Sequence, residues 1–94
     1  MRKMGSFEVK FKRSAEKDLR RLPKDVIKRV FTKIEELKQN ALPMQAIKLR
    51  GTERIYRIRV GDYRIIYEVD VKTKTIVIHY IRHRKEVYRR MPQH

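Results

Sequence analysis

The chain has 94 residues, enough for one small domain that buries about two thirds of the surface its unfolded form would expose. Twenty-six Lys and Arg against eleven Asp and Glu give a formal net charge of +15, so polyanions or acidic proteins are the expected partners. With no cysteine and three histidines, the composition excludes disulfides and thiolate metal sites, and we expect neither a metal nor another cofactor.

The sequence contains no targeting or membrane-spanning signal. The basic start, MRKMGSFEVKFKR, is not followed by an apolar run, and no stretch approaches the roughly 18 apolar residues of a membrane span. Repeats, low-complexity tracts and linkers are also absent from the sequence. We therefore expect a single cytoplasmic domain over residues 1–94 that has no membrane partner.

The first half of the chain predicts a strand and two helices. Apolar and charged residues alternate over residues 7–12, as in a half-buried strand. Ser14 is placed to cap a short helix, which Pro23 ends. A longer helix follows, with one apolar stripe over residues 26–37. Two such helices would form an antiparallel hairpin that covers one face of a sheet.

The second half predicts strands. After an irregular connection over residues 40–53, the segment IYRIRVGDYRIIYEV (55–69) reads as two strands joined by a two-residue turn at Gly61-Asp62. TIVIHYIRH (75–83) is the last strand, and a short helix or irregular tail closes the chain. The prediction is an α+β fold in the order β-α-α-β-β-β, with an antiparallel sheet.

The polar side of this hairpin carries arginines. The turn sets Arg59 directly opposite Arg64, and Arg57 opposite Ile66. Like charges in such pairs destabilise a sheet by about 0.2 to 1 kcal/mol, so folding alone would not select them. One interpretation is a solvated edge whose charges discourage aggregation. The other is an anion site, because arginine forks bind phosphate oxygens in pairs and strands hold them rigidly.

Two further segments carry basic or proton-transferring groups. In KLRG (48–51), Lys48 and Arg50 precede a glycine that lets the chain turn, which is a weak signal because such pairs are common on surfaces. In IRHRKEVYRR (81–90), Tyr88 and His83 are able to transfer a proton. The alternatives are a tyrosine packed against the sheet and a histidine that, like Lys85, belongs to an exposed basic tail.

In their order, K-L-R-G, Y-R-I-R-V-G-D-Y-R-I-I-Y-E-V and the ending R-H-R-x-E-V-Y resemble the RelE toxin family of the RelE/ParE superfamily, over about residues 7–90. The resemblance implies a toxin of a type II toxin–antitoxin system with two helices against an antiparallel sheet. It implies a small acidic RelB-like antitoxin as partner. It also implies metal-independent endoribonuclease activity on mRNA in the decoding site of the ribosome, with RNA contacts from Lys48, Arg50, His83 and Lys85.

The resemblance also implies which residues act. The family's catalytic positions fall on Arg57 and Arg59 of the first hairpin strand, Arg64 of the second, Arg82 at the end of the last strand, and Tyr88. In well-known bacterial members the two first-strand positions are lysines. Arginine stays protonated at working pH and cannot act as a base, so the general base is left open between Tyr88 and His83.

The expected reaction is attack of a 2′-hydroxyl on the adjacent phosphate. Arg64 and Arg82 would stabilise the developing charge, Arg57 and Arg59 would hold flanking phosphates, and Tyr88 would handle a proton or stack on a base. Two alternatives stand beside it: a ParE-like toxin that poisons DNA gyrase without enzymatic activity, and a basic RNA-binding protein without chemistry.

Overall fold

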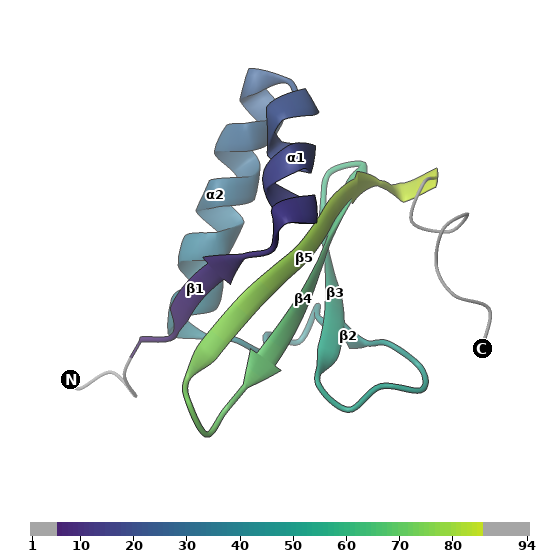
Figure 1. The fold of residues 1–94 in the computed structure, drawn as a ribbon. Coiled ribbons are helices and arrows are strands. Elements are labelled where there is room, and N and C mark those ends of the chain that lie inside the picture. Colours follow the sequence, from purple (N-terminus) through teal and green to yellow (C-terminus); the bar gives the residue numbers. More distant parts are fainter. Residues whose placement is uncertain (1–5, 86–94) are drawn as a thin grey trace.

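The computed structural model describes residues 6–85 as an α+β fold in which two helices cover one face of a five-stranded sheet (Figure 1). The elements are β1 (Glu8–Phe11), α1 (Arg13–Arg21), α2 (Lys24–Gln39), β2 (Ile47–Lys48), β3 (Ile55–Val60), β4 (Tyr63–Asp70) and β5 (Thr75–His83). The strand order is β1-β5-β4-β3-β2. The predicted α+β fold is confirmed, and the predicted C-terminal helix or tail lies largely outside the described residues.

The structure corrects three local expectations. The sheet is mixed, because β1 runs parallel to β5. The connection over residues 40–53 contains β2, whose two residues are too few to show a pattern. Ser14 does not cap α1, which begins at Arg13 with Lys12 at its N-cap. The Ser14 hydroxyl instead donates a hydrogen bond to the His79 carbonyl oxygen at 2.6 Å.

The β3–β4 hairpin has the predicted register. Ile58 faces Ile65 and Arg59 faces Arg64 across the turn. Gly61 has φ +61°, whereas no positive φ occurs at Asp62, the pattern of a type II′ turn. A Cβ atom at Gly61 would lie 3.0 Å from Nη1 of Arg29, so the turn also packs closely against α2.

The core lies between the helices and one face of the sheet. Its fully buried members are Ala15, Val30, Leu37, Ile65, Tyr67, Ile76 and Ile78. Burial of this apolar surface is the main stabilising contribution to the fold. Neither α1 nor α2 lies over the opposite face of the sheet, which we call the open face (Figure 1). Neither helix within residues 6–85 is long and apolar enough to cross a bilayer.

Tyr67 joins this core to the α2–β2 connection. Its ring is fully buried, and its hydroxyl donates a hydrogen bond to the Ala41 carbonyl oxygen at 2.9 Å. Burial raises the pKa of Tyr67 above the usual value, and the neighbouring Tyr56 raises it further. The phenol is therefore held in its neutral, donating form.

Replacing the phenol of Tyr67 should destabilise the fold. We expect Tyr67→Phe to lower the free energy of unfolding by about 1–2 kcal/mol, because the buried Ala41 carbonyl oxygen loses this donor. Urea denaturation measures the change. Tyr56→Phe is the matched control, because Tyr56 is only partly buried. Equal losses in the two variants would contradict a specific role for the Tyr67 hydrogen bond.

The raised pKa of Tyr67 also predicts a loss of stability at alkaline pH. The tyrosine of the unfolded chain ionises near its ordinary pKa of about 10, whereas the folded form keeps its proton to higher pH. The contribution of Tyr67 is thus fully present below about pH 10 and is lost as the pH rises further. The free energy of unfolding, measured between about pH 9 and 12, should fall more steeply for the native chain than for Tyr67→Phe. Parallel curves would refute this.

Candidate nucleic-acid interface

The open face of the sheet carries a row of three arginines from three adjacent strands. Arg59 of β3 pairs with Arg64 of β4, which pairs with Arg82 of β5. Directly paired residues of antiparallel strands project to the same side, with Cβ atoms about 5 Å apart. Arg82 therefore shares a face with Arg59 and Arg64, a point that the sequence left open. We call these three residues the arginine row.

A register shift in β5 precedes the arginine row. Tyr67 pairs with Ile78, but its neighbour Ile66 pairs with Tyr80, so His79 is the extra residue of a β-bulge. Beyond the bulge, β5 continues in register with β4 as far as His83.

Arg57 lies next to the arginine row on the same side of the sheet. It pairs with Ile66, which in turn pairs with Tyr80. Ile66 is only 2% exposed and Tyr80 is 40% exposed, so an apolar strip borders the row. The guanidinium carbon of Arg82 lies 4.8 Å from the centre of the Tyr80 ring, within the range of a cation–π contact.

Backbone carbonyl groups hold two arginines of the row. Nε of Arg59 donates a hydrogen bond to the Gly61 carbonyl oxygen at 2.9 Å. Nη1 of Arg64 makes a longer contact of 3.4 Å with the carbonyl oxygen of Tyr63. Restraint of this kind lowers the entropy that the side chains lose when they bind an anion.

The third arginine is held by Asp18 of α1, a residue that sequence analysis missed. Nε of Arg82 lies 3.2 and 3.1 Å from the two carboxylate oxygens of Asp18, which also accepts the Ile81 backbone N–H at 2.9 Å. At 8% exposed, Asp18 is the one buried charged residue of the described chain. The available signal was its position on the apolar stripe of the first helix, three residues after Ala15 and four before Leu22.

A groove along the open edge of β3 adds a lysine to this site. Its lining residues are Lys33, Gln45, Ile47, Arg57, Arg59, Gly61 and Arg64. Lys33 comes from α2 and was also missed, because the sequence gives no sign that this part of α2 lies near β3. Its Nζ lies 3.0 Å from the carboxylate of Glu36.

The KLRG residues lie apart from the arginine row. Lys48 pairs with Tyr56, whose ring packs against the core, so Lys48 projects to the other side of the sheet from Arg57. Arg50 is exposed in the turn after β2. The structure thus does not bring these two candidate RNA-binding residues to the site.

His83 lies on the other side of β5 from Arg82. It pairs with Tyr63, and the two rings are in edge-on contact with centres 5.4 Å apart. Its Nδ1 accepts a hydrogen bond from the backbone N–H of Lys85, an exposed residue. His83 and Arg82 nevertheless line one cavity at the end of α1. Tyr88 lies outside the described residues.

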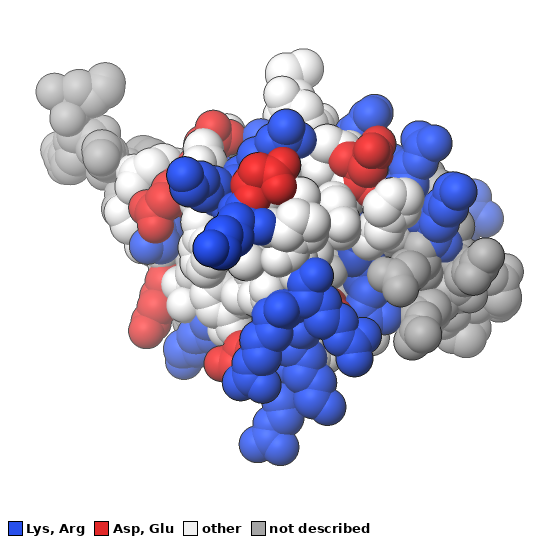
Figure 2. Space-filling model, turned by 90° about the horizontal axis from the view of Figure 1, so that it is seen from above, with Lys and Arg blue, Asp and Glu red and all other residues white. Residues whose placement is uncertain are grey.

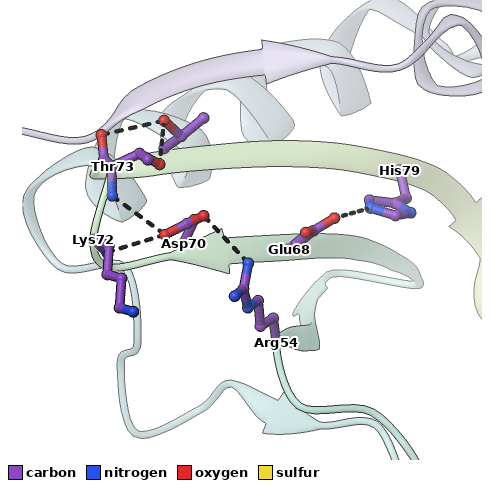
Figure 3. Close-up of polar contacts among 7 residues, drawn as sticks. Arg54, Glu68, Asp70, Lys72, Thr73 and His79 are labelled. Carbon is purple, nitrogen blue, oxygen red and sulfur yellow. Dashed lines mark hydrogen bonds and ion pairs between the residues drawn. The ribbon is translucent and has the colours of Figure 1, made fainter.

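The other end of the sheet has matched charges (Figure 3). Arg54 contacts Asp70 at 3.2 Å, and Nε2 of His79 lies 3.1 Å from a carboxylate oxygen of Glu68. Asp70 also accepts backbone N–H groups from residues 72–73. Arg54 and Asp70 carry opposite charges, whereas arginine faces arginine near the β3–β4 turn. The arginine row therefore does not support the fold in the way that the Arg54–Asp70 pair does.

Positive charge is also concentrated on one part of the surface. Seen from the end that carries the β3–β4 turn and the α1–α2 connection, Lys and Arg side chains form one broad cluster, and most acidic side chains in view lie outside it (Figure 2). Such a surface attracts polyanions over a distance of about one Debye length. Within residues 6–85, no group of three or more His, Cys, Asp or Glu residues could hold a metal ion.

Comparison with known proteins gives the family. The family model for the ParE toxin of the type II toxin-antitoxin system parDE matches residues 9–88. Toxin RelE3 of Methanocaldococcus jannaschii is 36% identical over 89 residues, which cover 90% of this chain and 99% of that toxin. The chain is a RelE-type toxin of the RelE/ParE superfamily.

Solved structures agree with this assignment. RelE in the archaeal RelE–RelB complex from Pyrococcus horikoshii superposes on this RelE-type toxin with a TM-score of 0.75 and 36% identity, covering 84% of this chain and 96% of that one. The isolated E. coli RelE toxin also gives 0.75, at 21% identity and with 93% and 100% of the two chains covered. At that identity, the second likeness supports the fold alone.

In this RelE-type toxin the arginine row should lower stability. Arg64→Gln removes both like-charge pairs of the row, so we expect the free energy of unfolding to rise by about 0.5–1 kcal/mol at low salt. The gain should shrink in 1 M NaCl, where the Debye length is about 3 Å. Urea denaturation at both salt concentrations measures it. Arg54→Gln, which breaks the pair with Asp70, is the control and should not stabilise; an equal gain there would contradict the explanation.

Proposed function

We propose that this toxin is a ribosome-dependent endoribonuclease that cuts mRNA without a metal and so inhibits translation. The observation that carries the proposal is the arginine row, in which three adjacent strands supply guanidinium groups that the protein itself restrains. Arginine forks form paired hydrogen bonds with phosphate oxygens. Preorganised donors of this kind stabilise charge that develops on a reacting phosphate.

In the proposed reaction, the 2′-hydroxyl oxygen attacks the adjacent phosphorus atom. A bond forms between the 2′-oxygen and phosphorus, and the bond to the 5′-oxygen of the next nucleotide breaks. The leaving 5′-oxygen takes up a proton from solvent, so the products are a 2′,3′-cyclic phosphate and a 5′-hydroxyl end. Arg64 and Arg82 stabilise the charge on the equatorial oxygens, and Arg57 and Arg59 hold the flanking phosphates.

Proton transfer is the weak part of this site. A guanidinium group does not give up its proton at working pH, so the 2′-hydroxyl proton must go to another residue. Tyr88 and His83 are the proposed acceptors, and Tyr88 is alternatively a surface on which a base stacks. A poor base suits a ribosome-dependent enzyme, because alignment of the message can contribute on the order of several kcal/mol to the rate.

An acidic RelB-like antitoxin is the proposed protein partner. Structures that share this fold include complexes of RelE with RelB from P. horikoshii, M. jannaschii and E. coli. A chain with a net charge of +15 favours an acidic segment that folds on contact and neutralises the arginine row. The cytoplasm, which holds ribosomes and mRNA, is the proposed location.

A second candidate is a toxin that poisons DNA gyrase without cleaving nucleic acid. The name of the matching family model, ParE, favours it. The arginine row favours the nuclease, because binding to a protein target does not require guanidinium groups from three adjacent strands on one face of the sheet.

Removal of Arg64 should abolish cleavage more than binding. With programmed ribosomes and the purified toxin, we expect cuts within codons, and Arg64→Ala should cleave at least about 100-fold more slowly while it still binds ribosomes. Mapping of mRNA ends and cosedimentation measure the two effects. A message with a 2′-deoxy nucleotide at the cut site should stay whole, and Arg54→Ala is the matched control at the other end of the sheet.

Three outcomes would contradict this proposal. Transcripts left whole by the native toxin would remove the nuclease assignment, and arrested replication in cells with intact mRNA would support the gyrase poison. Cleavage by Arg64→Ala at the native rate would remove the role of the arginine row. Binding without any cleavage would leave a basic RNA-binding protein.

A further inference from the structure

We propose that Asp18 is a positioning residue for Arg82. Its carboxylate holds the guanidinium group by Nε and leaves the fork of the two terminal nitrogens for the phosphate on the arginine row. This inference rests on the proposed function, and it concerns a residue of α1 that does not itself touch RNA.

The first observation is how α1 lies along β5. β1 pairs with β5 only as far as Ile78, so the next part of the β5 edge lacks a strand neighbour there. α1 takes this place, because Ser14 donates a hydrogen bond to the His79 carbonyl oxygen and Asp18 accepts one from the Ile81 N–H. Four helical residues rise about 6 Å, and two strand residues span about 6.6 Å. The match keeps Asp18 in register with this end of β5.

The second observation is that Arg82 is restrained in two directions. Nε contacts both carboxylate oxygens of Asp18, and the guanidinium group also lies over the ring of Tyr80. Within residues 6–85, the hydrogen bonds of the Arg82 side chain are those made by Nε. The outer edge of the guanidinium group, formed by Nη1 and Nη2, is the one suited to a bidentate contact with phosphate.

The third observation is the opposition of charges across the strands. Arg64 lies directly across from Arg82 and repels it. Without Asp18, the long side chain of Arg82 could move away from Arg64 into one of its many other rotamers. The carboxylate holds Nε at the edge of β5 that faces away from Arg64, so its attraction and the repulsion from Arg64 act in the same direction and keep Arg82 in one rotamer even before a phosphate arrives.

Folding alone does not require a carboxylate at this position. The Ile81 N–H needs an acceptor, and a neutral amide would supply one with a smaller desolvation cost than a charge that is 8% exposed. The negative charge of Asp18 matters instead for its contact with Nε of Arg82. Asp18→Asn therefore keeps an acceptor for Ile81 and removes the ionic contact, which separates the two roles of the residue.

The rate of cleavage at saturating ribosome concentration tests the inference. We expect Asp18→Asn to lower this rate by about 10- to 100-fold and to change ribosome affinity by less than about threefold. Ser14→Ala loses a hydrogen bond at the same strand edge and should lower Tm without slowing cleavage. Glu16→Gln makes the same charge change on an exposed part of α1 and should leave both the cleavage rate and Tm unchanged. Equal rates for Asp18→Asn and Ser14→Ala would overturn the inference.

A double-mutant cycle separates positioning from a general structural effect. Since Asp18 acts through Arg82, Asp18→Asn should cause no further loss of rate in an Arg82→Ala background. Losses that multiply in the double variant would show that Asp18 acts independently and would overturn the inference.

A measurement without activity keeps this test distinct from that of the proposed function. In NMR spectra of the free toxin, the Nε–H of Arg82 should exchange slowly with water, and Asp18→Asn should remove the protection. Rapid exchange in the native toxin would overturn the inference even if RNA is cut. Slow exchange in a toxin that cuts no RNA would overturn the proposed function and support the Asp18–Arg82 contact.

Discussion

The antiparallel register of β3, β4 and β5 is the constraint on which the site depends. Gly61 and Asp62 join β3 to β4 in a two-residue turn, so every residue of β3 has a fixed partner in β4. Because strand side chains alternate, a slip of one residue would turn Arg59 toward the helices and Ile58 toward solvent. The isoleucines on the core side therefore keep the arginines on the open side, and packing of the core fixes the position of the arginine row.

The two ends of the sheet differ in how their charged side chains are paired. At one end Arg54 forms an ion pair with Asp70, and His79 lies within hydrogen-bond distance of Glu68, so these contacts support folding. At the other end the arginine row concentrates like charges, and the free energy of core packing offsets the repulsion. Asp18 supplies an opposite charge to one arginine of the row, Arg82, and does so from α1 without occupying the open face. The like-charge pairs of the arginine row thus lower the stability of the fold without a compensating contact between Arg59 and Arg64.

Sequence was sufficient wherever structure depends on neighbours in the chain. The hairpin followed from a turn dipeptide with alternating residues on both sides, and α2 followed from its apolar stripe. The parallel pairing of β1 with β5, the short β2, and the contacts of Ser14 and Asp18 depend on residues far apart in the chain, which a single sequence does not reveal. Ser14 shows the difficulty well: its place before an apolar run suggested a helix cap, but its hydroxyl bonds to a strand 65 positions away. The catalytic roles of the arginine row and Tyr88 remain predictions.

The bulge at His79 determines which side chains at the end of β5 project from the open face of the sheet. From Asp70 to Tyr67, β4 pairs with β5 in one register, and continued unbroken it would set Arg82 opposite Tyr63, on the side of the helices. Ile81 would then stand among the arginines. Because of the one extra residue, every side chain of β5 after His79 faces the opposite side of the sheet from the one it would face without the bulge. The number of residues between the β4–β5 turn and Arg82 therefore determines the face on which Arg82 lies. Any relative that gains or loses a single residue there must restore the count elsewhere or give up the third guanidinium.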